Sequence, residues 1–288
     1  MDKFITKKIL KDSNDNLLSF VFDLLDGKVS KRKAKSLIEN GLCFLNNKIE
    51  LISSKILKKN DFIKIYSNWD SLLDLANDDI EKDIKILYED AFLIAIEKPI
   101  KIASDDPLIK KIAPYLIHRL DKNTSGVLLL SKSQDFFKKM QKMFMDKKVS
   151  KKYIAVVDGK VLDKKFKVEG KIYKKSFTHG QTIYGFSKKE GKHSLSFFES
   201  VESCEKYSVL YCYPITGRTH QIRVHLMSRS HPILGDFLYS KSFKYKNYSK
   251  RLFLHSLQIS FVHPETLKKI EIKSNIPKDF LRFIGKNP

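Results

Sequence analysis

The sequence has only three cysteines, Cys43, Cys204 and Cys212, and their spacing forms no C-x-x-C pair. An odd, scattered set argues against a disulfide scaffold and against a thiolate metal site, and it fits a reducing compartment. Long apolar runs are also absent, because no uncharged stretch approaches the ~18 residues that span a membrane. Residues 1–11 alternate charged and apolar side chains instead of forming a signal-peptide core. We therefore expect a soluble, cytoplasmic protein without a membrane partner.

Acidic residues are in short supply too: 33 Asp and Glu stand against 55 Lys and Arg, a formal net charge of +22 over 288 residues. This charge attracts polyanions, so nucleic acid is the first partner to consider. A compositional bias toward lysine without functional purpose is the alternative explanation. Only seven of the basic residues are Arg, so each Arg indicates a place where a planar group with several donors is needed. The 42% hydrophobic content excludes global disorder.

The N-terminal quarter predicts a small basic unit of helices and a hairpin. Dense apolar residues over 17–26 indicate a short helix, and a second helix is expected between the N-cap Ser30 and the stop at Gly41. Residues 43–51 indicate a hairpin about two Asn residues, and 62–67 a further strand. The second helix carries its basic residues opposite its apolar face: Lys31, Arg32, Lys33 and Lys35.

An abrupt charge reversal predicts a domain boundary. Residues 70–83 hold six acidic residues against one Lys, as expected of a solvated linker. We therefore predict a small basic domain at 1–70, an acidic linker at 71–83 and a larger domain at 84–288.

Strand patterns dominate the larger domain. They recur at 84–98, 127–131, 152–159, 167–173, 193–200, 208–215, 252–262 and 268–274. Helical periodicity is confined to 134–147, 219–228 and 277–284, and the apolar stripe of the first of these is interpreted as core packing. Because the helices do not alternate with the strands as βαβ units would, we predict an α+β fold with a mixed, mostly antiparallel sheet and flanking helices.

The string HRLDKNTSG at 118–126 stands between a Pro-containing stretch and an apolar strand. It is therefore a loop at a strand edge, where catalytic groups usually lie. Its Arg, Lys, His and hydroxyl side chains would keep Asp121 ionised. Local composition alone favours a structural turn, in which Asp121 and Asn123 bond the nearby backbone.

This string closely resembles the HRLDxxTSG signature of RluA-type pseudouridine synthases. Four further blocks resemble the same family in the same order along residues 86–264. They are LYEDAFLIAIEKP, KKYIAVVDG, PITGRTHQIRVH with the following HPILGD and Tyr239, and RLFLHSLQISFVHP. Residues 17–67 resemble the small RNA-binding domain shared with ribosomal protein S-four. The two resemblances imply that the domain at 1–70 binds RNA and that the domain at 84–288 is catalytic. One departure is the absence of glycine between residues 99 and 118, where the family usually has one in a longer segment; this leaves RNA specificity more open than the chemistry.

The resemblance implies isomerisation of a uridine in RNA to its C-glycoside, with Asp121 as the essential carboxylate and neither cofactor nor metal. Covalent attack by the carboxylate and proton abstraction through a glycal-like intermediate both stay open. Arg223 would pair with Asp121 through two hydrogen bonds, and Tyr153 would stack on the extruded uracil and relay a proton. Arg119 would fill the gap that the base leaves. The other residues expected to contact RNA are His118, Thr124, Arg218, Lys31, Arg32, Lys33 and Lys35.

Two other classes of function compete with this interpretation. A catalytically inactive RNA-binding or ribosome-associated protein would not need Asp121, Tyr153 and Arg223 together. A metal-dependent nuclease is disfavoured, because His220 and His225 are five residues apart and no carboxylate-rich ligand set lies nearby. The expected partner is structured RNA, with large-subunit ribosomal RNA favoured and transfer RNA as the alternative, acted on by a monomer.

Overall fold

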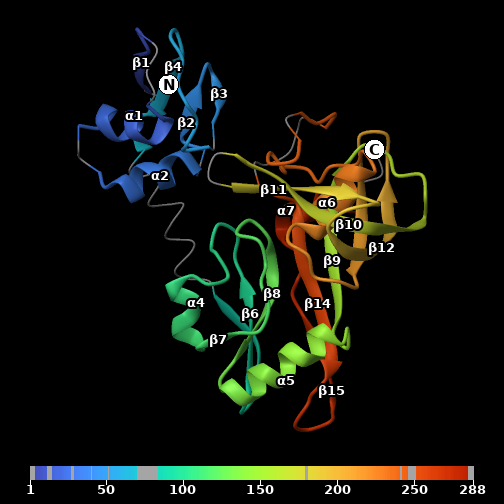
Figure 1. Cartoon of the computed structure of the whole chain (residues 1–288). Helices are drawn as coiled ribbons and strands as arrows, with labels where there is room; N and C mark the ends of the chain where they lie inside the picture. Colours follow the sequence, from blue (N-terminus) through green and yellow to red (C-terminus); the bar gives the residue numbers. More distant parts are fainter. Residues whose placement is uncertain are drawn as a thin grey trace. The chain divides into compact units, whose positions relative to one another are not determined.

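A computed structural model gives the fold of the chain (Figure 1). The structure describes residues 4–11, 15–26, 29–39, 41–50, 52–69, 84–178, 181–240, 242–245 and 251–284. The chain divides into two compact units: an N-terminal unit of Met1–Asp83 with Phe177–Thr182, and a C-terminal unit of Ile84–Ser176 with Ile183–Pro288. The predicted acidic linker at 71–83 lies outside the described residues, and the assignment of 1–70 as an RNA-binding domain remains a prediction.

The N-terminal unit combines two helices with a four-stranded sheet. Its elements are β1 (Phe4–Lys8), α1 (Leu17–Leu24), α2 (Lys31–Glu39), β2 (Cys43–Leu45), β3 (Lys48–Ile49) and β4 (Phe62–Tyr66). The sheet has the order β1-β4-β2-β3, with antiparallel neighbours. Asn16 caps α1, since its Oδ1 accepts the Ser19 N–H at 2.9 Å. Leu37 and Ile38 of α2 are fully buried against Ile63 and Ile65 of β4, so the apolar stripe of the helix supplies the core.

The C-terminal unit is built on a sheet of eleven strands among the described residues. Its strands are β5 (Lys85–Glu89), β6 (Leu93–Lys98), β7 (Tyr115–Leu116), β8 (Ser125–Ser131), β9 (Ser150–Asp158), β10 (Lys165–Thr178), β11 (Gln181–Ser187), β12 (Lys192–Ser203), β13 (Tyr207–Pro214), β14 (Leu254–Val262) and β15 (Lys269–Lys273). The order is β11-β10-β12-β13-β9-β14-β8-β6-β5, with β15 on β14 and β7 on β8. Its described helices are α4 (Pro107–Ile112), α5 (Gln134–Met145), α6 (Gln221–Ser228) and α7 (Lys278–Leu281).

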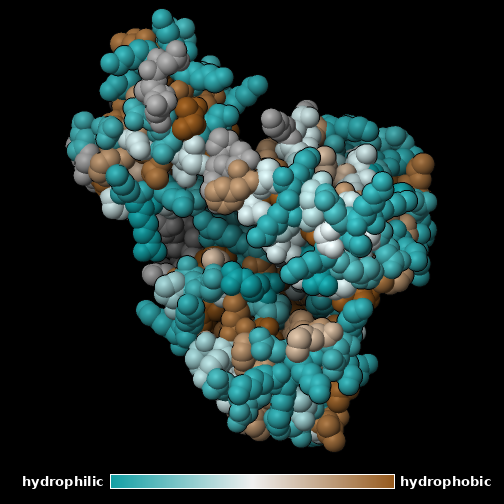
Figure 2. All heavy atoms as spheres, viewed as in Figure 1, coloured by the Kyte–Doolittle hydropathy of each residue, from teal (hydrophilic) through white to brown (hydrophobic). Residues whose placement is uncertain are grey.

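A short parallel contact near the centre of the sheet sets the topology apart from a simple meander. β8 pairs with β14 in parallel over His255↔Ser125 and Ser256↔Gly126, whereas β9 pairs with β14 antiparallel. The fold is therefore α+β with a large, mostly antiparallel sheet, as the strand-rich sequence predicted. Hydrophilic side chains cover most of the visible surface (Figure 2). In the described part of the chain, no helix is both long enough and apolar enough to cross a bilayer.

Helix α5 packs its apolar stripe on the sheet, which confirms the core interpretation of that pattern. Ser133 caps the helix by accepting the Phe136 N–H. Phe136 and Met140 are buried with Leu93 and Val127, while the neighbouring aromatic residues of the stripe cover the same cluster. The helix thereby covers the end of the sheet where β8 and β6 run side by side (Figure 1).

Two fully buried histidines make the fold acid-sensitive. His225 contacts the hydroxyls of Ser194 (2.9 Å) and Ser196 (3.1 Å), and His255 contacts those of Ser125 (2.8 Å) and Ser274 (3.0 Å). Burial lowers the pKa of His225 to about 4 and that of His255 to about 3. Both rings are therefore neutral in the folded protein at pH values where the unfolded chain already binds protons.

The free energy of unfolding should fall as the pH drops below about 6.5, the ordinary histidine pKa. Below this pH the two histidines bind protons in the unfolded state but not in the folded state. Each of them therefore lowers the free energy of unfolding by about 1.4 kcal/mol per pH unit. Denaturant titrations should show about 4 kcal/mol less stability at pH 5 than at pH 7 from this pair. Equal stability at the two pH values would contradict the neutral, buried state of these rings.

Candidate active site

The register of three central strands brings the predicted catalytic segments to one place. Tyr153 on β9 lies opposite Ser256 on β14, and Ser256 lies opposite Gly126 at the start of β8. The HRLD loop runs directly into Gly126, so Asp121 is carried to the same part of the sheet as Tyr153. Residues far apart in sequence therefore meet through strand pairing.

Gly126 is required at this crossing for two reasons. Its φ is +109°, and a Cβ built on it would lie 2.1 Å from the Ser256 carbonyl oxygen, which is backbone and cannot move aside. Gly126→Ala should therefore lower the free energy of unfolding by about 3–5 kcal/mol through strain and overpacking. Gly217→Ala is the matched control, because its Cβ would meet only the Lys151 Nζ at 4.0 Å. Thermal denaturation in which both variants unfold like the parent would contradict this role.

Arg223 joins two carboxylates. Its Nη1 donates to the Asp121 Oδ2 at 2.9 Å, while its Nε and Nη2 donate to the two oxygens of Asp236, each at 2.8 Å. The predicted pairing of Arg223 with Asp121 is present, but the prediction that it is two-pointed is wrong. The two-point contact goes to Asp236, because Arg223 and Asp236 are both buried while Asp121 reaches the guanidinium from the loop. Asp236 was part of a recognised block, yet nothing in its sequence pattern identified it as this partner.

The charge of Arg223 is secured by these contacts. Burial opposes the charged form, but Asp236 and Asp121 outweigh burial and raise the pKa of Arg223 above its ordinary value. Asp121 receives a single hydrogen bond from Arg223, and its side chain is 24% exposed. Among the described residues no side chain donates to its Oδ1. One carboxylate oxygen of Asp121 is therefore held by Arg223, and no described side chain donates to the other.

His220 and Tyr239 form a second layer of contacts beside this pair. The His220 Nε2 lies 3.9 Å from the Asp121 Oδ2, and its Nδ1 lies 2.8 Å from the Tyr239 hydroxyl. The Arg223 guanidinium sits 5.0 Å from the centroid of the Tyr239 ring. Burial and the Arg223 charge lower the pKa of His220, so it stands beside Asp121 as a neutral ring. Sequence reasoning gave neither residue this position, although both lie in recognised blocks.

Tyr153 is buried, with 8% of its surface exposed. Burial raises its pKa to about 12, and the nearby charge of Asp121 acts in the same direction. The side chain is therefore a neutral phenol at physiological pH. A neutral phenol can stack on a base and pass a proton through its hydroxyl, but it does not act as a phenolate base.

The end of β6 and the segment after it hold the HRLD loop through hydrogen bonds to its backbone. The fully buried Lys98 donates from Nζ to the carbonyl oxygens of Pro99 (2.7 Å), Ile102 (2.8 Å) and Lys122 (3.2 Å). Burial lowers the pKa of Lys98 to about 7, against the opposing effect of Asp121. The Ser104 hydroxyl donates to the Leu120 carbonyl oxygen at 2.8 Å. These contacts place residues 120–122, and the sequence gave no signal for them beyond the Lys-Pro of the opening block.

Arg119 points into solvent, and its side chain is 66% exposed. Both Nη atoms donate to the Asp105 Oδ2 at 3.1 Å, and this contact lowers the pKa of Asp105. Asp105 lies in the segment between residues 99 and 118 where the sequence departs from the family. The predicted base-stacking role of Arg119 remains a prediction.

His118 and Thr124 stabilise the HRLD loop through contacts within the fold. The ring of His118 stacks on Phe144 with centroids 5.3 Å apart, and its Nε2 accepts the Leu129 N–H at 3.1 Å. Burial lowers the pKa of His118 to about 3, which keeps this nitrogen an acceptor. Thr124 is buried, and its N–H donates to the Asp121 carbonyl oxygen at 3.0 Å. Both residues therefore stabilise the loop, while their predicted contacts with RNA remain predictions.

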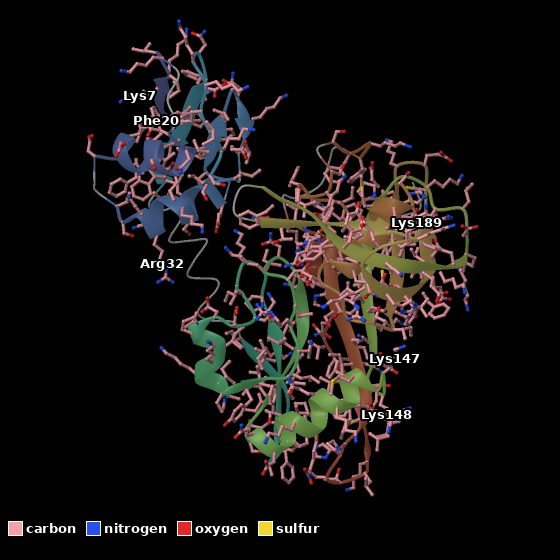
Figure 3. The ribbon with its side chains drawn as sticks, viewed as in Figure 1. Lys7, Phe20, Arg32, Lys147, Lys148 and Lys189 are labelled. Carbon is pink, nitrogen blue, oxygen red and sulfur yellow. The ribbon has the colours of Figure 1, made fainter. Side chains whose placement is uncertain are left out.

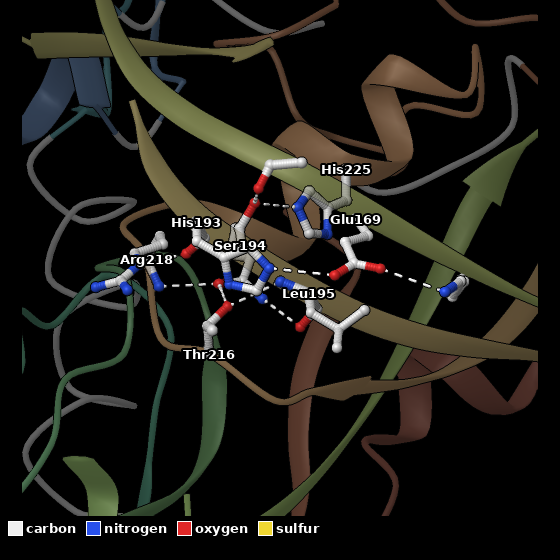
Figure 4. A network of polar contacts seen from close by, with 10 residues as sticks. Glu169, His193, Ser194, Leu195, Thr216, Arg218 and His225 are labelled. Carbon is white, nitrogen blue, oxygen red and sulfur yellow. Dashed lines mark hydrogen bonds and ion pairs between the residues drawn. The ribbon is translucent and has the colours of Figure 1, made fainter. Parts of the chain in front are cut away.

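Arg218 is held on the loop that leads into α6. Its Nε donates to the His193 carbonyl oxygen at 2.8 Å, and the same loop is tied to β12 by the Leu195 N–H and the Thr216 Oγ1 (Figure 4). Gln221 adds hydrogen bonds to Leu195, Thr216 and Arg218. The network fixes the start of the helix that carries Arg223. Arg218 itself is exposed, and its predicted contact with RNA is not tested by these interactions.

The basic residues of α2 belong to the N-terminal unit. Lys31, Arg32 and Lys35 are exposed, and Lys33 is half-buried with its Nζ 5.4 Å from the Trp69 ring centroid. Arg32 extends outward from the helix, as Figure 3 shows. The predicted basic face is therefore present on the helix. Among the described residues of both units, no three His, Cys, Asp or Glu side chains gather as metal ligands do.

Comparisons with known proteins show which family the chain resembles. The family model described as RNA pseudouridylate synthase matches residues 93–228. The ribosomal large subunit pseudouridine synthase C of Buchnera aphidicola from Acyrthosiphon pisum is 32% identical, over 98% of this chain and 96% of the relative. An uncharacterized RNA pseudouridine synthase of Helicobacter pylori is 33% identical, over 88% of this chain and 94% of its own length.

A solved structure shares the fold. The human RNA pseudouridylate synthase domain containing 1 superposes with a TM-score of 0.60 at 22% identity, covering 68% of this chain and 85% of that protein. The family match lies on the stretch that carries Asp121, Tyr153 and Arg223, and the full-length relatives extend it over nearly the whole sequence. The chain belongs to the RNA pseudouridylate synthases, a family of isomerases.

Proposed function

We propose that this protein isomerises a uridine of large-subunit ribosomal RNA to pseudouridine, with Asp121 as the essential carboxylate. The observation that carries the proposal is the asymmetric hold on Asp121: Arg223 bonds its Oδ2, and no described side chain donates to its Oδ1. The ribosomal substrate is supported by relatives named for the large ribosomal subunit, among them the Buchnera enzyme that aligns over nearly the whole chain.

The reaction requires the N1–C1′ bond to break and a C5–C1′ bond to form. In one route the Asp121 carboxylate attacks C1′ as N1 leaves; in the other it removes the C2′ proton, so that a glycal forms as the uracil departs. Both routes need an oriented carboxylate, and the contact with Arg223 orients that of Asp121. When C5 of the turned uracil bonds C1′, the Asp121–C1′ ester bond breaks in the first route, and C2′ regains its proton from Asp121 in the second. The C5 proton then leaves to solvent while N1 gains one, so the product is an isomer.

Tyr153 supports the proposal from the uracil side. As a neutral, buried phenol in register with Ser256 and Gly126, it offers a flat ring for the base and a hydroxyl that can relay the C5 proton. Arg119 would fill the place of the extruded base, because a planar cation can stack where the uracil has left.

The RNA target can be identified directly. Pseudouridine mapping of total RNA from cells with and without this protein should show one or more large-subunit positions that depend on it. Re-expression of the parent, but not of Asp121→Asn, should restore them. A map unchanged by loss of the protein would contradict the proposed substrate, and a change confined to transfer RNA would reassign it.

We propose that helix α2 docks RNA through its basic face. Replacing Lys31, Arg32, Lys33 and Lys35 by Gln should weaken binding and make its salt dependence shallower, by roughly 0.9 in the log–log slope for each duplex phosphate that is no longer neutralised. The matched control replaces Lys268, Lys269, Lys273 and Lys278, which removes the same charge elsewhere. Salt titrations with equal slopes for both variants would contradict docking by α2.

A further inference from the structure

The outer face of the N-terminal sheet carries aromatic side chains. Along β4 the residues alternate, with Ile63 and Ile65 fully buried in the core and Phe62, Lys64 and Tyr66 on the opposite face. A solvent-facing strand position usually holds a polar residue, because only the core side gains from apolar burial. Packing in the core of this unit therefore does not explain why aromatic residues lie on the outer face.

Strand pairing gathers these side chains into one cluster. Phe4 of β1 lies opposite Tyr66, and Phe44 of β2 lies opposite Lys64. The ring centroids are 4.9 Å apart for Phe4 and Tyr66, 5.5 Å for Phe44 and Tyr66, and 5.9 Å for Phe4 and Phe44. Phe4 is 37% exposed, and the other two rings are half-buried. We call the surface formed by Phe4, Phe44, Lys64 and Tyr66 the aromatic sheet face.

The charge on this face is positive. The Lys64 Nζ lies 5.2 Å from the centroid of the Phe4 ring and donates to the Asn47 Oδ1 at 2.8 Å, so it is held over the cluster. Lys8 stands on the same side of the sheet, opposite Phe62. None of the outward positions of β1, β2 and β4, all within the described part of the chain, holds an Asp or Glu.

We infer that the aromatic sheet face binds single-stranded RNA, with bases stacked on its rings and the backbone held by its lysines. Rings on a sheet beside cations are suited to unpaired nucleotides, because every base has a flat face and every linkage a negative charge. A second copy of this basic chain would bring lysines against lysines, and an aliphatic partner would gain little from the cations. The inference rests on the proposed RNA substrate, but it assigns a surface separate from α2 and from Asp121.

Photo-crosslinking to the full chain tests the surface without altering it. A short oligouridine containing 5-iodouridine should crosslink to the peptides that carry Phe4, Phe44 or Tyr66, and an excess of unlabelled oligouridine should abolish the crosslinks. Crosslinks found only on α2 or on the C-terminal unit would overturn the inference.

Substitution gives the second readout. A double variant with Phe4→Ser and Tyr66→Ser should bind the oligouridine at least about tenfold more weakly by fluorescence anisotropy, since it loses two base–ring stacks that each contribute a factor of about five or more. A variant with Phe4→Tyr and Tyr66→Phe keeps both rings and should bind like the parent. Phe197→Ser is the matched control, because Phe197 is a 44% exposed aromatic residue of the C-terminal unit.

Activity separates this inference from the proposed function. The parent and Phe197→Ser should isomerise a minimal stem-loop substrate at equal rates, and the far-ultraviolet circular dichroism of the Phe4→Ser/Tyr66→Ser variant should match that of the parent, which shows that this variant folds. If neither protein makes pseudouridine, the proposed function fails while the crosslinks still decide the RNA surface. If the double variant binds oligouridine like the parent but changes the sedimentation of the protein, the face is a protein interface and the inference is wrong.

Discussion

Asp121→Asn is expected to abolish pseudouridine formation while leaving the affinity for RNA nearly unchanged. The amide keeps the size of the side chain, but it can neither attack C1′ nor accept a proton. Single-turnover assays should therefore show a loss that appears entirely in the rate of the chemical step and not in binding. Product formation near the parental rate would remove Asp121 from the mechanism.

The stability of the same variant tests how Arg223 is held. Because Arg223 keeps its two-point contact with the buried Asp236, loss of the Asp121 charge should cost no more than about 1 kcal/mol. Asp236→Asn is the contrasting variant, because it removes the buried negative charge that neutralises the Arg223 guanidinium. We expect it to lower the free energy of unfolding by about 3–5 kcal/mol. Denaturant titrations that reverse this order would mean that Asp121, rather than Asp236, is the main partner of Arg223.

Arg119→Ala is expected to slow the reaction strongly on a paired substrate and only weakly on an unpaired one. Extruding a uridine from a stack costs a few kcal/mol, and each ~1.4 kcal/mol is a factor of ten in rate, so a loss of tens- to several-hundredfold is the expected scale. Where the target uridine is already unstacked, little extrusion is left to assist. Single-turnover rates on paired and unpaired versions of one substrate measure this difference.

Two controls make the Arg119 experiment specific. Arg119→Lys should behave more like Arg119→Ala than like the parent, because an ammonium keeps the charge but cannot fill a flat slot between bases. Arg229→Ala is the matched control, since Arg229 is similarly exposed and also pairs with an exposed carboxylate, that of Asp163. Equal losses by Arg119→Ala on both substrates would mean that Arg119 acts on the electrostatics of Asp121 or on the fold.

The sequence predicted most strands of the C-terminal unit, because their apolar residues stand in short runs or alternate with polar ones. The pattern at 152–159 became β9 (Ser150–Asp158), and that at 252–262 became β14 (Leu254–Val262). β11 (Gln181–Ser187) was missed. It lies at the end of the sheet and, within the part of the chain that the structure describes, pairs only with β10, so it carries little of the apolar pattern that marks a central strand.

The residues of the candidate site that lie in family motifs were predicted from the sequence. The contacts that arise only when the chain folds were not. Asp121 and Arg223 are 102 residues apart, and the family resemblance alone brought them together. The two-point partner Asp236 depends on how α6 packs, and the Lys98 contacts depend on backbone carbonyl groups. No pattern of residue types encodes such contacts, since backbone acceptors are present at every position.

Release of tritium from RNA labelled at C5 of uridine tests the central claim most directly, because only a reaction at C5 loses that hydrogen. Unmodified large-subunit ribosomal RNA, transcribed with [5-³H]uridine and incubated with the purified full chain in chelator, should release tritium up to a fixed stoichiometry per RNA. Asp121→Asn should release none. No release by the parent, or equal release by the variant, would contradict a pseudouridine synthase that works through Asp121.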